Sequence, residues 1–157
     1  MLNPLNSLSP TTLKFLCYTK PLSIDYACWQ SMTARVLKVI KGSCHCGAIS
    51  FSYPRKPDWL TDCNCSVCRR YHPLWAYAKV SEITLHAAAD ATIAYRHGDR
   101  SLAMYSCKIC GCTTHWIGLD SDESSKMAVN FRMCEPYDIE SVRIRKLDGA
   151  ETWEFID

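Results

Sequence analysis

Three cysteine clusters carry the strongest chemical signal in this sequence. They are Cys44-His45-Cys46-Gly47, Cys63-Asn64-Cys65-Ser66-Val67-Cys68 and Cys107-Lys108-Ile109-Cys110-Gly111-Cys112. A tetrahedral zinc ion needs thiolate sulfurs at about 2.3 Å, and a tight turn after one cysteine directs the next sulfur back to the same ion. Gly47 and Gly111 directly follow paired cysteines, where a residue without a Cβ can adopt the left-handed conformation that closes such a turn. The clusters therefore predict metal binding.

Spacing alone allows two divisions of these cysteines among metal ions. The simpler one makes a closed structural site of four thiolates and leaves three thiolates from one short loop. The four are Cys44, Cys46, Cys107 and Cys110, and the three are Cys63, Cys65 and Cys68. Three ligands leave one coordination position open to water or substrate, as in catalytic zinc sites. The other division is a single site made from the first and second clusters, with Cys110 and Cys112 left over.

Composition restricts the compartment and the class of partner. The chain has 11 cysteines, an odd number, and no secretion signal, so a disulfide framework is not expected. Reduced thiols predict a cytoplasmic protein. No apolar run approaches the roughly 18 to 20 residues that cross a bilayer. The net charge of +2 and the scattered basic residues do not favour a nucleic-acid surface.

The clusters lie in a segment with the pattern of a β domain. Residues 1–34 lack periodicity, which predicts an extension outside the core. This extension holds Cys17 and Cys28, and Met32 is a candidate site for the natural start of translation. Residues 35–157 alternate short β-branched or aromatic runs with turns. The predicted strands are Val36–Lys41, Ala48–Tyr53, Leu74–Val80, Ile83–His86, Thr92–Arg96, Ser101–Ser106, Thr113–Ile117, Met127–Phe131, Val142–Leu147 and Thr152–Ile156. Short helices are expected at Cys65–Tyr71 and Tyr137–Ser141, and hairpin turns at Gly98-Asp99 and Asp148-Gly149.

The three clusters, in this order and spacing, resemble the glutathione-dependent formaldehyde-activating enzyme family, also called the centromere protein V family. The matching segments are Gly42–Ala48, Cys63–Arg70 and Cys107–Gly111. The resemblance implies a mainly β fold of small antiparallel sheets in a β-tent arrangement, stapled by zinc-cysteine knuckles. It also implies two zinc ions divided four and three, one structural and one catalytic. Asn64 departs from the family pattern, which often has histidine at that position.

The resemblance further implies carbon-sulfur lyase chemistry, in which S-hydroxymethylglutathione or a related thiol adduct is formed or cleaved. Cys63, Cys65 and Cys68 would carry the catalytic ion, and Arg69 and Arg70 offer guanidinium groups for glutathione carboxylates. The alternative is a non-enzymatic zinc module that binds protein or chromatin. Such a module gains nothing from an open coordination position on the metal.

Four other residues near the clusters have structural interpretations. Trp75 and Tyr77 are expected to pack in the core. His115 is expected to be a hydrogen-bonded structural histidine, and Cys134 a plain thiol.

Overall fold

The computed structural model describes residues 38–119 and 125–157. The strands are β1 Ile40–Ser43, β2 Ile49–Tyr53, β3 Trp59–Cys63, β4 Trp75–Lys79, β5 Thr84–Ala87, β6 Thr92–Tyr95, β7 Leu102–Cys107, β8 Thr113–Gly118, β9 Lys126–Asn130 and β10 Arg143–Leu147. The helical turns are α2 Cys68–Tyr71, η1 Val80–Glu82, η2 Phe131–Met133 and α3 Pro136–Ile139. The predicted mainly β fold class is confirmed.

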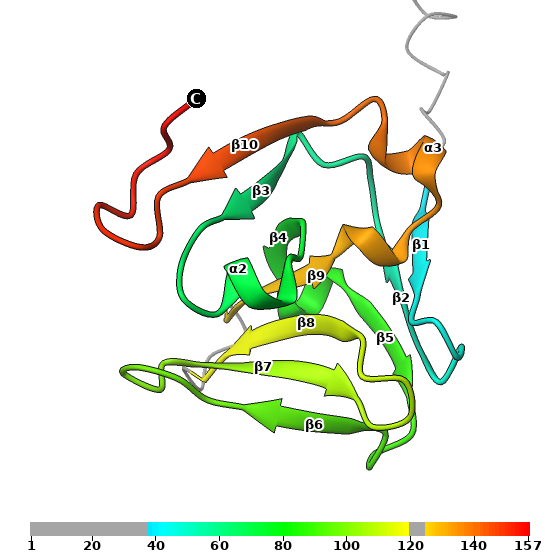
Figure 1. Cartoon of the computed structure of the whole chain (residues 1–157). Helices are drawn as coiled ribbons and strands as arrows, with labels where there is room; N and C mark the ends of the chain where they lie inside the picture. The colour runs from blue at the N-terminus through cyan, green and yellow to red at the C-terminus, as the bar shows by residue number, and fades with distance from the viewer. Residues whose placement is uncertain (1–37, 120–124) are drawn as a thin grey trace, which may run out of the picture. The chain divides into compact units, whose positions relative to one another are not determined.

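The strands form two small sheets (Figure 1). One has three strands in the order β1-β2-β5, and the other has seven in the order β10-β3-β4-β9-β8-β7-β6. Neighbouring strands are antiparallel except β10, which runs parallel to β3. The parallel pair brings the C-terminal part of the chain beside the strand that ends at Cys63.

Alternation along β2 places one face of this strand in the core, as its sequence predicts. Ile49, Phe51 and Tyr53 are buried, and the Tyr53 ring meets Phe131 edge-on at a centroid distance of 5.2 Å. Gly42 of β1 lies against the Phe51 ring so closely that a Cβ at this position would overlap it. The glycine that opens the first cysteine motif is therefore required by packing.

Two strand predictions were wrong. β3 was missed, because Leu60 and Thr61 are both buried between β10 and β4 and the segment lacks a simple alternation. The predicted strand Thr152–Ile156 is reduced to one isolated bridge between Leu147 and Phe155. The chain turns at Trp153, whose φ is 60°, and β10 takes β3 as its partner instead. The Gly98-Asp99 hairpin between β6 and β7 is confirmed.

The predicted extension at residues 1–34, with Cys17 and Cys28, lies outside the described residues. Within residues 38–119 and 125–157, none of the helices has the length and apolarity that a membrane crossing requires.

Candidate metal centres

Four cysteines from two turns meet at one corner of the domain. Cys44 and Cys46 lie in the β1–β2 turn, Cys107 is the last residue of β7, and Cys110 lies in the β7–β8 turn. Figure 1 shows the two turns on the same side of the molecule. All four sulfurs lie within 4.8 Å of one another. The Cys46 sulfur is 3.6 Å from both Cys44 Sγ and Cys107 Sγ. Tetrahedral geometry with 2.3 Å bonds gives sulfur-sulfur distances of about 3.8 Å, close to the two distances of 3.6 Å, so the spacing of this group suits a zinc ion.

Each of these two turns is a cysteine knuckle closed by a glycine. Gly47 has φ 79° and donates its N–H to the Cys44 carbonyl, and Gly111 has φ 73° and donates to the Cys107 carbonyl. Both conformations are left-handed, as predicted. The Ile49 N–H also donates to Cys44 Sγ at 3.3 Å, which orients this buried sulfur toward the group.

The second group consists of Cys63, Cys65 and Cys68, whose sulfurs also lie within 4.8 Å of one another. β3 ends at Cys63, the loop supplies Cys65, and α2 begins at Cys68. The turn is held by the Arg69 N–H, which donates to the Cys65 carbonyl at 3.0 Å. The structure thus places the first and third clusters together and the second cluster by itself, as in the simpler division of the cysteines.

Hydrogen bonds from N–H groups orient the three sulfurs of the second group. The Cys65 N–H donates to Cys63 Sγ at 3.5 Å, the Cys68 N–H to Cys65 Sγ at 3.4 Å, and the Trp75 indole N–H to Cys68 Sγ at 3.3 Å. The pKa of Cys63 is lowered to about 6, first by a hydrogen bond from Cys68 and then by backbone N–H groups, although burial opposes this change. A thiolate is the form that binds metal.

Trp75 is buried, as predicted, and it also holds a candidate ligand through its indole. Tyr77, by contrast, is 39% exposed, so the prediction that it packs in the core was wrong. It lies on the same side of β4 as Trp75, and its ring meets Trp116 at a centroid distance of 6.0 Å. The indole contact could not be predicted from the sequence, because it depends on the chain reversal between Cys68 and Trp75.

A pocket of about 340 Å³ adjoins the three-cysteine loop. Its lining residues come from this loop, α2 and the β6–β7 hairpin and are Ser66, Val67, Arg70, Tyr71, Tyr95 and His97. Tyr95 and His97 are stacked with 6.2 Å between ring centroids, and Arg70 donates to the Ser66 carbonyl at 2.5 Å. Of the two arginines predicted to meet substrate, Arg70 lines this pocket and Arg69 does not. Tyr95 and His97 are distant in sequence and were missed.

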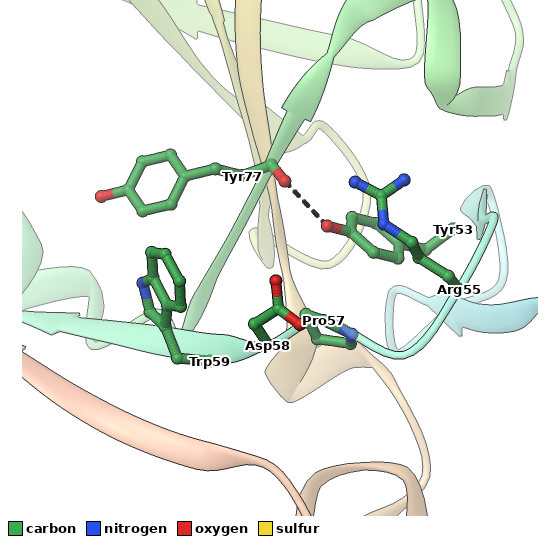
Figure 2. A pocket seen from close by; sticks show the side chains of 6 residues that line it. All are labelled: Tyr53, Arg55, Pro57, Asp58, Trp59 and Tyr77. Carbon is green, nitrogen blue, oxygen red and sulfur yellow. Dashed lines mark hydrogen bonds between the residues drawn. The ribbon is translucent and has the colours of Figure 1, made fainter.

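A smaller pocket of about 120 Å³ lies near the start of β3, lined in part by Trp59, Asp58 and Arg55 (Figure 2). Figure 2 shows the Tyr53 hydroxyl donating to the Tyr77 carbonyl across it, at 2.7 Å. The Arg55 guanidinium is paired with Glu82 at 3.1 Å. Since none of its lining residues belongs to the three cysteine clusters, we do not assign this pocket to the candidate metal centres.

The remaining described residues singled out by the sequence have structural roles. His115 is buried, and its Nδ1 shares a 2.8 Å hydrogen bond with Thr114 Oγ1. Its ring stacks on Tyr105 at a centroid distance of 4.6 Å. Cys134 is buried in the hydrophobic core, where burial raises its pKa to about 12. Cys112 accepts the Cys107 N–H through its carbonyl and is not one of the four grouped sulfurs.

Burial of His115 predicts a pH dependence of stability. Burial lowers the pKa of His115 to about 4, whereas the value in an unfolded chain is about 6.5. The unfolded state therefore binds more protons between these values, and the free energy of unfolding should fall by up to about 3 kcal/mol as pH decreases from 6.5 to 4. The free energy of unfolding, measured by urea titration between pH 6.5 and pH 4, should fall less steeply with decreasing pH in His115→Phe than in the wild type. The phenylalanine keeps a ring against Tyr105. Equal slopes would contradict this assignment.

Fold and sites together define a cysteine-knuckle β protein with two separate groups of candidate metal ligands. The family model for the glutathione-dependent formaldehyde-activating enzyme matches residues 39–140, and the chain belongs to this family. The chain is also similar to a Rhodobacter sphaeroides protein of known crystal structure. The two are 27% identical, with a TM-score of 0.54, and the match covers 67% of this chain and 99% of that one.

Proposed function

We propose that this protein is a zinc-dependent carbon-sulfur lyase that forms or cleaves S-hydroxymethylglutathione or a related thiol adduct. The observation that carries the proposal is the group of three sulfurs from Cys63, Cys65 and Cys68, with a pocket directly beside it. Family membership supports glutathione as the thiol and formaldehyde as its carbonyl partner. The four-cysteine group would hold a second, structural zinc ion with no vacant position.

The reaction is a reversible addition. The thiolate sulfur of glutathione forms a bond with the carbonyl carbon of formaldehyde, the carbonyl electron pair moves to oxygen, and that oxygen takes the proton released by the thiol. A zinc ion held by Cys63, Cys65 and Cys68 would supply positive charge that favours thiolate over thiol. The chain's own contribution is to orient the three ligand sulfurs through the N–H groups of Cys65, Cys68 and Trp75.

The pocket beside the loop supplies groups that suit a thiol carrying carboxylates. Arg70 is fixed by the Ser66 carbonyl and retains further N–H donors for a carboxylate. The His97 imidazole adds a second polar group, and the Tyr95 and Tyr71 rings offer apolar faces for the peptide part of glutathione. We therefore assign substrate binding to Arg70 rather than Arg69.

We also propose that residues 35–157 are the functional domain. Because the ligands are reduced thiols, we propose the cytoplasm as its compartment.

Turnover of a synthetic adduct tests the function. The zinc-loaded protein should release formaldehyde from S-hydroxymethylglutathione faster than the uncatalysed reaction. Arg70→Ala should raise KM about tenfold, as expected for one lost charged hydrogen bond, while Arg69→Ala should leave KM unchanged. Two bound zinc ions without any turnover of glutathione adducts would instead favour the non-enzymatic zinc module.

A further inference from the structure

The turn that follows β10 lies beside the three-cysteine loop. In the parallel pairing of β10 with β3, Leu147 is opposite Cys63, and the Asn64 N–H donates to the Leu147 carbonyl at 3.2 Å. Figure 1 shows that the loop after β3 and the turn after β10 leave from neighbouring strand ends. Residues 148–150 of this turn lie beyond the segment matched by the family model, which ends at residue 140.

The Asn64 side chain fastens this turn to the cysteine loop at two points. Its Nδ2 donates to Asp148 Oδ1 at 2.8 Å, and its Oδ1 accepts the Ala150 N–H at 2.9 Å. The other carboxylate oxygen of Asp148 accepts from the Thr152 hydroxyl at 3.0 Å, so the carboxylate is fixed from both sides. Asn64 uses both ends of its amide and sits between two candidate metal ligands, Cys63 and Cys65.

Gly149 lies against the Cys63 sulfur. A Cβ built on it would be 2.6 Å from Cys63 Sγ and 3.2 Å from the Cys65 Cβ, much closer than van der Waals contact. Its φ is not in the positive range, so the glycine is required by this contact rather than by the backbone conformation.

We propose that Asn64 and Gly149 are positioning residues of the three-cysteine site, with Asn64 holding the 148–150 turn so that the Gly149 backbone lies directly against the Cys63 sulfur. Outer hydrogen bonds of this kind orient metal ligands, and their loss typically weakens metal binding about 10- to 100-fold. The inference rests on the proposed function only in taking these three cysteines as metal ligands.

Metal release from the purified, fully loaded chain tests this role without any measurement of turnover. Zinc transfer to a chromogenic chelator should show two phases, the faster from the three-cysteine site and the slower from the four-cysteine site. Asn64→Ala and Gly149→Ala should each accelerate the faster phase about 10- to 100-fold and leave the slower phase unchanged. Glu151→Ala, an exposed position in the same turn, is the matched control and should change neither phase.

An exchanged pair distinguishes positioning from general support of the fold. Asn64→Asp alone places a carboxylate against Asp148 and should accelerate release, whereas Asn64→Asp combined with Asp148→Asn restores one donor and one acceptor and should return the rate to within about threefold of wild type. In the cobalt-substituted proteins, the visible spectrum of the three-thiolate site should change most in the variants that release metal fastest and least in the exchanged pair. The proposal would be overturned if Asn64→Ala and Gly149→Ala both released zinc at wild-type rates, or if they accelerated both phases of release equally. It would also be overturned if the wild type bound metal only at the four-cysteine site. A chain that behaves as expected here but lacks turnover would refute only the proposed function.

Discussion

Replacing Cys107 by serine is expected to leave the domain unfolded or nearly so at neutral pH. Cys107 is buried, and its sulfur lies 3.6 Å from Cys46 Sγ within the four-cysteine group. Binding of a structural zinc ion contributes on the order of 10 kcal/mol to folding, which is comparable to the whole stability of a typical domain. Circular dichroism during urea titration, with zinc content measured on the same sample, should show a loss of several kcal/mol and of metal.

Cys112→Ser is the control for this experiment, because Cys112 lies in the same turn but outside the grouped sulfurs. It should retain both the metal content and the unfolding midpoint of the wild type. A Cys107→Ser protein with wild-type stability and two bound zinc ions would remove the four-cysteine site from the description of this fold.

Cys65→Ser is expected to reduce turnover of S-hydroxymethylglutathione by at least about 100-fold while the protein stays folded. A serine hydroxyl remains protonated at neutral pH and is a poor zinc ligand, so the three-cysteine group loses one of its three thiolates. Cys65 is only partly buried, whereas Cys63 and Cys68 are buried, so its substitution disturbs packing least. Steady-state kinetics and zinc stoichiometry on one preparation should show lost activity with one zinc ion retained.

Cys134→Ala is the matched control for Cys65→Ser, because it removes a thiol that lies in the core. Its kcat/KM should equal that of the wild type. Retention of full activity by Cys65→Ser, with metal still at the three-cysteine site, would place the chemistry elsewhere in the molecule.

Local sequence patterns predicted those parts of the fold and sites whose partners are close along the chain. The alternation of Ile49, Phe51 and Tyr53 predicted a buried strand face, and the left-handed glycines at positions 47 and 111 followed from their place after paired cysteines. Each of these features is decided within about five residues by backbone geometry or side-chain period.

Long-range pairing could not be predicted in this way. The chain reverses after Asp148-Gly149, as the composition of this dipeptide predicts, and forms one antiparallel bridge between Leu147 and Phe155. The contact of this turn with Cys63 could not be predicted, because it depends on the pairing of β10 with β3, more than 80 residues earlier. Tyr95 and His97 likewise meet Arg70 only because the β6–β7 hairpin lies across from α2. Nothing in their own neighbourhood distinguishes these residues from ordinary exposed aromatic side chains.

The four-cysteine corner joins positions that are 61 residues apart, Cys46 and Cys107, and it connects the three-stranded sheet to the seven-stranded one. An ion bound there would close a long loop, and closing a loop of this length removes on the order of 4 kcal/mol of chain entropy from the unfolded state. The entire second cluster, Cys63 to Cys68, lies inside that loop. We therefore expect metal to load in order, because an ion at the four-cysteine group would fix both ends of the segment that carries the three-cysteine group.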